Sequence, residues 1–184
     1  RKIWANNRDL QAEGFYIDDQ DIQQALNGFE KKLNGLDRVG DILLAEAMTT
    51  KQLYKAAATR CGAKDFSRNH EQGDLANDFL NHGNYLAYGL AATTLWVLGI
   101  PHGFAVMHGK TRRGAMVFDV ADLIKDAIVL PWAFICAKEK ATEQEFRQQI
   151  LQKFTEHKAL DFMFDQVKAA ALQRFVTGIV GEQL

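Results

Sequence analysis

The sequence predicts a mainly α-helical protein, a helical bundle with short extended connectors, and three features support that class. Apolar residues recur at three- and four-residue intervals through several long segments, which gives a helix one apolar face. Only two prolines, Pro101 and Pro131, occur in 184 residues, so long uninterrupted helices are favoured. Hydrophobic residues make up 47% of the chain, enough to bury a substantial core between such helices.

The first half of the chain is expected to hold three helices behind an irregular segment at 1–17. An acidic first turn beginning at Asp18 suits the positive end of a helix dipole. Gly35, Gly62 and Gly99 follow the last apolar residues of the periodic segments, where helices commonly end. The predicted helices cover 18–33, about 36–60 and 74–98, and a polar loop covers 63–73.

The second half is expected to alternate short apolar runs with helices. The runs at 103–107 and 114–118 could be short strands or extended packing segments. Pro131 suits the first turn of a helix, and Thr142 with Glu145 three residues later fits a capping box. The predicted helices cover 118–125, 131–140, a span beginning at 142, and 159–176, so that the helical domain occupies 18–184.

Composition excludes some function classes. The formal net charge is −1, so any binding of nucleic acid must depend on a local basic patch. Cys61 and Cys136 are far apart and form no CxxC motif, which favours buried thiols in a reducing compartment.

No apolar run is long enough to span a membrane and no signal-peptide pattern occurs, so a cytoplasmic protein is expected. Arg1 in place of an initiator methionine suggests that upstream residues are missing.

The most informative stretch runs from His108 to Lys125 and sets an imidazole, several cations and two carboxylates between apolar segments. Asp119 and Asp122 are three positions apart, so on a helix their side chains share a face. At about 5–6 Å, two such charges repel by roughly 3 kcal/mol at an effective dielectric constant of about 20. A solvated pair needs no partner, whereas a partly buried pair needs a cation, and a divalent metal is one way to supply it.

Glu46 lies within an otherwise apolar stripe of the helix predicted at 36–60. The stripe consists of Val39, Leu43, Glu46, Thr50, Leu53 and Ala57. An isolated charge on a buried face is costly, so the glutamate should be paired, coordinated or protonated. Alternatively, Glu46 lies at the edge of the stripe and reaches solvent.

Together, Glu46, His108, Asp119 and Asp122 form an oxygen-rich set of potential ligands with one nitrogen. This mix suits Mg²⁺ or Mn²⁺ better than zinc, which prefers sulfur and several imidazoles. Such an ion is suited to phosphoryl chemistry. Bringing Glu46 to the other three is an inference about the fold, and His108 alone could equally be a structural histidine behind a buried segment.

Several cations surround the same carboxylates and could bind DNA phosphates. They are Lys110, Arg112, Arg113 and Lys125. Guanidinium groups bind phosphate through paired hydrogen bonds and lysines add positive charge, although a solvated, charged loop is the alternative. Tyr88 lies in an apolar helix and belongs either to the core or to a wall of the same site.

These residues resemble those of the CRISPR-associated spacer-acquisition integrases, the first protein of the adaptation module. The resemblance covers about 36–154, which corresponds to the helical C-terminal domain of that family, and it is strongest to the I-F subtype. Four blocks in order carry it: Leu44-Ala-Glu46 with Lys51 to Tyr54 downstream, Tyr85-Leu-Ala-Tyr88-Gly89, Gly103-Phe-Ala-Val-Met-His108, and Phe118-Asp119-Val-Ala-Asp122-Leu-Ile-Lys125 followed by Pro131-Trp-Ala-Phe134.

The resemblance implies a metal site and a reaction. In the family a glutamate, a histidine and a later acidic residue bind a divalent metal, and these correspond to Glu46, His108 and Asp122. Asp119 matches a nearby acidic position that supports activity. The implied reaction is transesterification, in which the 3′-hydroxyl of a short DNA attacks a phosphodiester of the CRISPR repeat. Nicking of branched DNA uses the same site.

The resemblance also implies partners. Lys125 matches a basic position that contacts DNA, and Tyr88 matches a tyrosine near the site. Members act as homodimers bridged by the small second adaptation subunit, which in the I-F subtype is fused to the helicase-nuclease. The family's N-terminal β-rich domain has no matching strand pattern here, so a truncated chain is expected, and Ala47 replaces a glycine found in many members.

Two other functions stay open. A non-catalytic helical DNA-binding or scaffold module with a degenerate metal site would bind DNA in a salt-sensitive manner but would not cleave it. A helical di-iron protein is disfavoured, because such bundles use repeated Glu-x-x-His pairs and the sequence has none.

Overall fold

The computed structural model describes residues 19–63, 65–71, 73–104, 106–108 and 113–181, and these residues form helices without any strand. The elements in chain order are α2 (Asp19–Leu33), α3 (Val39–Arg60), α4 (Leu75–Val97), α5 (Ala115–Ile124), the π-helix η1 (Lys125–Val129), α6 (Leu130–Lys138), α7 (Glu143–Glu156) and α8 (Ala159–Gly181). The predicted helical class is therefore confirmed, while the irregular segment predicted at 1–17 lies outside the described residues.

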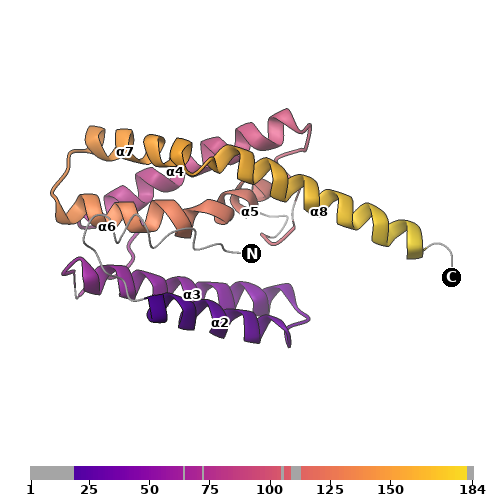
Figure 1. The fold of residues 1–184 in the computed structure, drawn as a ribbon, viewed down its shortest axis with the longest axis horizontal. Coiled ribbons are helices and arrows are strands. Elements are labelled where there is room, and N and C mark those ends of the chain that lie inside the picture. Colours follow the sequence, from indigo (N-terminus) through magenta and orange to yellow (C-terminus); the bar gives the residue numbers. More distant parts are fainter. Residues whose placement is uncertain (1–18, 64, 72, 105, 109–112, 182–184) are drawn as a thin grey trace.

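The helices are arranged in two layers (Figure 1). Helices α2 and α3 follow each other through a short connection and pack together as a pair below the rest of the bundle. In the other layer α4 packs against α5 and α6, and α7 and α8 cover α4. The candidate site lies where α3 faces the α5–η1 segment of the opposite layer.

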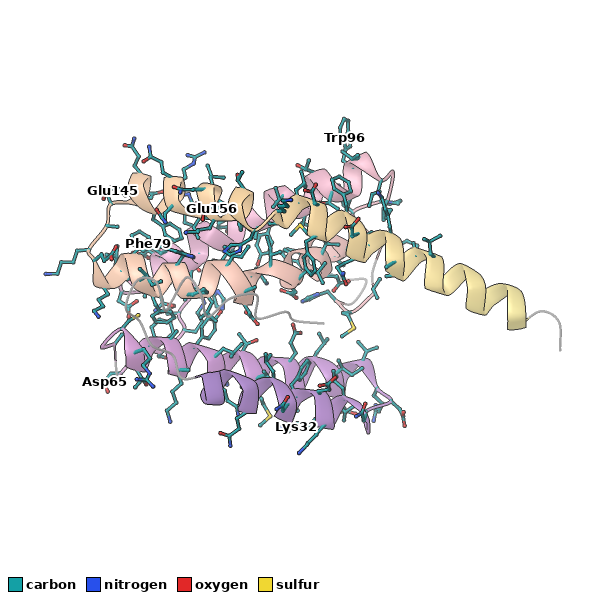
Figure 2. The ribbon with its side chains drawn as sticks, in the orientation of Figure 1. Lys32, Asp65, Phe79, Trp96, Glu145 and Glu156 are labelled. Atoms are coloured by element: carbon teal, nitrogen blue, oxygen red, sulfur yellow. The ribbon has the colours of Figure 1, made fainter. Side chains whose placement is uncertain are left out.

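Close packing in the core brings α4 against α7 and η1. The rings of Phe79 in α4 and Phe146 in α7 stack with centroids 4.4 Å apart. Gly83 lies one turn further along α4, where an added Cβ would be 2.5 Å from a Val129 methyl group. Only glycine permits this approach of α4 to η1. Figure 2 shows Phe79 inside the bundle, whereas Trp96 projects from the end of α4 and is 77% exposed.

The region from 103 to 138 differs from the prediction. The described residues of 103–107 form turns and bends, and 114–118 is no strand, because α5 begins at Ala115. Gly114 caps this helix in the left-handed conformation, with φ +71°. Helical structure then continues without a break to Lys138, because the apolar residues between the two predicted helices are buried against α4.

The π-helix η1 joins α5 to α6. Its register is shown by the Leu130 N–H, which donates to the Lys125 carbonyl five residues earlier. Pro131 follows at the start of α6 and has no N–H to donate, so an ordinary α-helical hydrogen bond is missing at this point in any case. π-turns within helices are rare and are found frequently at functional sites.

The buried face of α3 is displaced from the predicted stripe. The buried residues are Ala45, Thr49, Leu53, Ala57 and Ala58, while Val39 is 46% exposed. The helix packs against α2 on one side and α6 on another, so two neighbours, not one core, determine which residues it buries. Glu46 is consequently half-buried at the edge of the buried face, not at its centre.

The remaining helices follow their predicted boundaries closely. Asp74 caps α4 by accepting a hydrogen bond from the Asn77 N–H. The capping box of α7 is present, since Thr142 Oγ1 accepts from the Glu145 N–H and Glu145 Oε2 accepts from the Thr142 N–H at 2.7 Å. Helix α8 starts at Ala159 as predicted and extends to Gly181, beyond the predicted end at 176. Within the described part of the chain, none of the helices combines the length and apolar character needed to cross a membrane.

Candidate functional site

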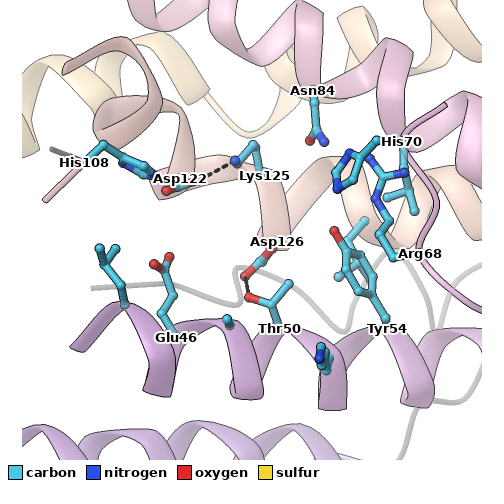
Figure 3. Close-up of a pocket in the computed structure, with 15 residues that line it drawn as sticks. Glu46, Thr50, Tyr54, Arg68, His70, Asn84, His108, Asp122, Lys125 and Asp126 are labelled. Atoms are coloured by element: carbon cyan, nitrogen blue, oxygen red, sulfur yellow. Dashed lines mark hydrogen bonds and ion pairs between the residues drawn. The ribbon is translucent and has the colours of Figure 1, made fainter. Parts of the chain in front are cut away.

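A cavity of about 520 Å³ lies between α3 and the opposite layer (Figure 3). Its lining brings together side chains from distant parts of the chain, including three of the predicted site residues, Glu46, His108 and Asp122. They come from α3, from the loop before α5, and from α5 itself. The remaining polar lining residues are Thr50, Lys51, Tyr54, Arg68, His70, Asn84, Lys125 and Asp126.

Asp119 of α5 holds the loop that carries His108. Its Oδ2 accepts from the backbone N–H groups of Val106 and Met107 at 3.2 and 3.0 Å. Its Oδ1 accepts from the His108 backbone N–H at 3.2 Å and lies 2.6 Å from His108 Nδ1. A carboxylate can only accept this last bond, so Nδ1 carries the proton and, in the neutral ring, Nε2 carries the lone pair. The histidine is thereby oriented as a metal ligand usually is.

Asp122 forms an ion pair with Lys125 one turn later along the helix. Burial, the largest single influence, lowers the pKa of Lys125, but Asp122, Tyr88 and Asp126 together outweigh it, and the pKa is raised. The ammonium also lies over the ring of Tyr88, 5.3 Å from its centroid. Tyr88 in turn packs edge-on against Phe118 at 4.8 Å. Lys125 and Tyr88 therefore form one wall beside Asp122.

The predicted crowding of Asp119 and Asp122 is relieved within the protein. Asp119 is satisfied by the N–H groups of the His108 loop, and Asp122 by the Lys125 ammonium. The two carboxylates therefore need no metal to coexist. Any case for a metal depends on what Glu46, His108 and Asp122 can do together.

The donor set suits a hard divalent ion, although it is not assembled as a coordination shell. Glu46 projects from α3 into the cavity on the side where His108 and Asp122 lie (Figure 3). Two carboxylates and one oriented imidazole are ligands that Mn²⁺ accepts and that Mg²⁺ accepts in part. In the described part of the chain, however, no group of three His, Cys, Asp or Glu side chains is close enough to hold one ion.

Asp126 is a cavity residue that sequence reasoning missed. It is buried in η1, only 7% exposed, and accepts a hydrogen bond from Thr50 Oγ1 of α3 at 3.3 Å. Burial raises the pKa of nearby Tyr54 above its ordinary value, and the Asp126 carboxylate raises it further. The spacing could have revealed it, since Asp126 follows Asp122 by four residues, but the helix was expected to end at 125.

The chain is similar in sequence to known proteins over most of its length. No protein-family model matches it. A protein of Pectobacterium atrosepticum named CRISPR-associated endonuclease Cas1 is 51% identical over 173 residues, which cover 93% of this chain and 53% of that protein. A protein of Pseudomonas aeruginosa with the same name is 48% identical over 179 residues, which cover 96% of this chain and 55% of that protein. This chain is homologous to the Cas1 endonucleases.

The fold agrees with this relationship. A chain from a crystal structure described as a TtCas1–DNA complex has a TM-score of 0.64 and covers 90% of this chain and 59% of its own length. Its sequence is only 20% identical, so that likeness concerns the fold alone. The chain spans about half the length of the Cas1 relatives it matches, and the resemblance stated from the four sequence blocks is confirmed.

The residues predicted to bind DNA in this Cas1 homologue do not all lie at the cavity. Lys125 lines the cavity, and Tyr88 contacts it from α4. Arg113 is exposed just before Gly114 and is not part of the cavity lining. Lys110 and Arg112 lie outside the described residues. The cavity lining also contains two cations that were not predicted to bind DNA, Lys51 of α3 and Arg68 of the loop between α3 and α4.

Proposed function

We propose that this chain is a metal-dependent DNA integrase and endonuclease domain of CRISPR adaptation. It would join the 3′-hydroxyl of a short DNA to a phosphodiester of the CRISPR repeat by transesterification, and nick branched DNA at the same site. The observation that supports this best is the single cavity that Glu46, Asp122 and the oriented His108 share. The Cas1 relatives supply the endonuclease class.

Glu46, His108 through Nε2, and Asp122 would hold Mg²⁺ or Mn²⁺. When bound, such an ion polarises a phosphodiester and makes an attacking hydroxyl easier to deprotonate. Asp119 keeps the imidazole in one tautomer and one orientation. Lys125 and its Tyr88 contact neutralise and shield the Asp122 side of the cavity. The protein's own contribution is thus positioning and charge compensation.

DNA is the proposed substrate. The TtCas1 structure is described as a complex with DNA, and its fold is shared by this chain. Lys125 at the cavity, together with Arg113 and with Lys110 and Arg112, which precede it in the sequence, would bind the phosphate backbone. A homodimer bridged by the small second adaptation subunit, in the I-F arrangement fused to the helicase-nuclease, is proposed from the sequence resemblance alone.

One observation favours a second candidate, a DNA-binding or scaffold module without catalysis. Lys125 already pairs with Asp122, and within the described residues no three-ligand cluster is assembled. In that case the ammonium would replace the ion permanently. The module would bind DNA, and the binding would weaken with salt through counterion release.

Cleavage of branched DNA with and without Mn²⁺ distinguishes the two candidates. The integrase predicts metal-dependent nicking that His108→Ala and Asp122→Asn each reduce by at least about 100-fold, because the members of a ligand set fail together. His82→Ala is the matched control, since His82 pairs with Glu143 at 3.0 Å, away from the cavity. Parental nicking in both site variants, or no metal-dependent nicking by the wild type, would defeat the catalytic proposal.

A further inference from the structure

The cavity has a second end that the metal site does not use. Figure 3 shows Arg68, His70 and Tyr54 gathered at the end opposite Glu46 and His108. Arg68 and His70 belong to the loop between α3 and α4, and both line the cavity. No carboxylate of the described residues pairs with Arg68. Arg68 therefore brings a positive charge to the end of the cavity that lies away from Glu46 and His108.

Within the part of the chain that the structure describes, the hydrogen-bond acceptors of Arg68 are neutral groups. Its guanidinium donates to the Asn69 carbonyl at 2.6 Å, to Asn77 Oδ1 at 3.0 Å and to Asn81 Oδ1 at 2.6 Å. Its Nε is buried and has no hydrogen-bond partner among the described residues. These contacts fix the orientation of the side chain but leave its charge uncompensated. A partly buried cation of this kind is stabilised most by an anion.

The loop does not require Arg68 to stay in place. Asn77 already ties it to α4, because its Oδ1 accepts from the Asn69 N–H at 2.8 Å and its Nδ2 donates to the Ser67 carbonyl at 3.0 Å. Asp74 completes this attachment as the cap of α4. Attachment of the loop to α4 therefore does not require the positive charge of Arg68, since a neutral donor could bond to the same amide oxygens.

The charge of Arg68 acts on the pKa of His70, whereas at Tyr54 burial and the Asp126 carboxylate outweigh it. The pKa of His70 is lowered, first by the charge of Arg68, then by burial and by Lys125. His70 is an exposed residue, so this effect reaches the mouth of the cavity. Two cations from different elements therefore act on the same point, which favours an anion there.

We propose that Arg68 binds a backbone phosphate of the DNA strand next to the one held at the carboxylate end, with His70 and Asn84 lining this phosphate subsite. The proposal rests on the proposed function, because it assumes that the strand being cut lies along the cavity. Neighbouring phosphates of one strand repeat every few ångströms, so a strand that reaches Asp122 also presents phosphates beyond it. Arg68 is accordingly a positioning residue, and no bond is made or broken at it.

The salt dependence of DNA binding tests this subsite. Affinity for a branched DNA is measured in EDTA from 50 to 200 mM salt, so that the metal site does not contribute. In Arg68→Gln the slope of log K against log salt should fall in magnitude by about one. Between 50 and 200 mM salt the variant should therefore lose about threefold less affinity for DNA than the wild type loses. Arg68→Lys should retain the wild-type slope.

Two further variants separate charge from folding. Asn81→Ala removes an acceptor of Arg68 but keeps the cation, so it should lower the thermal midpoint without changing the slope. His70→Asp, at an exposed position, sets a carboxylate beside Arg68 and should reduce the slope as Arg68→Gln does. This variant decides the question if Arg68→Gln does not fold.

Each outcome is decisive. An unchanged slope in folded Arg68→Gln, or in His70→Asp if Arg68→Gln is unfolded, overturns the subsite. An equal change in Asn81→Ala also overturns it, because loop structure would then explain the effect. Metal-dependent nicking by the wild type, combined with an unchanged slope in Arg68→Gln, would support the proposed function and reject the phosphate subsite. A reduced slope without any nicking would leave the phosphate subsite on a non-catalytic DNA-binding protein, and absence of DNA binding by the wild type would remove both.

Discussion

Asp119 holds His108 twice through one oxygen, accepting from its backbone N–H at 3.2 Å and from its ring Nδ1 at 2.6 Å. The other oxygen of Asp119 accepts from the backbone N–H groups of Val106 and Met107, the two residues before His108. One carboxylate of α5 thus fixes both the loop and the imidazole that the loop carries. The side chain that faces the cavity owes its tautomer to a neighbour that does not need to touch a metal or a substrate.

Replacing Asp119 by asparagine tests this support. The amide has one acceptor oxygen and places an NH₂ group against donors, so His108 should lose its fixed orientation. We expect affinity for Mn²⁺, measured by titration calorimetry, to fall by about 10- to 100-fold while the protein stays folded. Asp161→Asn, at an exposed position in the first turn of α8, is the control. Unchanged Mn²⁺ affinity in Asp119→Asn would contradict the role assigned to Asp119.

Lys125→Met tests whether the ammonium competes with a metal for Asp122. The change keeps an apolar stem beside Tyr88 and frees the Asp122 carboxylate. Mn²⁺ should bind more tightly, by about fivefold for a pair worth about 1 kcal/mol. Lys153→Met is the matched control, because Lys153 pairs with Glu156 at the same spacing, 2.8 Å apart and away from the cavity. Equal binding in Lys125→Met would show that the ion pair does not compete with the metal, and weaker binding would show that Lys125 helps to hold it.

Local sequence patterns predicted those parts of the fold that local interactions decide. The capping box at Thr142 and Glu145 placed the start of α7, and Asp74 placed the start of α4. The helical start at Ala115 was missed, because the apolar run that it opens fits a strand equally well when read alone. Packing against α4 determines the helix there, and no pattern within 114–118 records that contact.

The candidate site likewise contains residues that the sequence predicted and one that it did not. Glu46, His108 and Asp122 were singled out by residue type and resemblance, and the structure brings them to one cavity, while their catalytic role stays a prediction. Arg68 was missed because its position depends on Asn77 and Asn81 from the following helix. Such a contact between a loop and a helix face leaves no periodic signal in the sequence.

The thiol of Cys61 should be slow to react. Burial raises its pKa from 9.0 to about 11, with the charge of Lys138 opposing the shift. At pH 9 about 1% of it is thiolate, compared with about half of an ordinary thiol, so iodoacetamide should modify it about 50-fold more slowly than in the unfolded chain. The Cys136→Ala variant isolates this thiol for the measurement. Equal rates in the folded and unfolded chains would contradict the burial of Cys61.

The same shift has a consequence for stability. The folded state holds the Cys61 proton more tightly than the unfolded state between pH 9.0 and about 11. This group therefore contributes stability that is present below pH 9.0 and is lost as the pH rises through that window. Urea denaturation of wild type and Cys61→Ala at pH 8 and pH 10.5 should show a smaller loss with pH in the variant.

Gly83→Ala and Gly89→Ala in α4 should change stability in opposite directions. At Gly83 a Cβ would lie 2.5 Å from a Val129 methyl group and 3.1 Å from the Phe146 ring, so overpacking should cost about 1–3 kcal/mol. At Gly89 nothing lies within 4 Å of the added Cβ, so the better helix propensity of alanine should add up to about 1 kcal/mol. Urea unfolding followed by circular dichroism measures both. A stabilised Gly83→Ala would mean that α4 and η1 are not as closely packed as the structure shows, and the π-turn that carries Lys125 and Asp126 to the cavity would then lack its support.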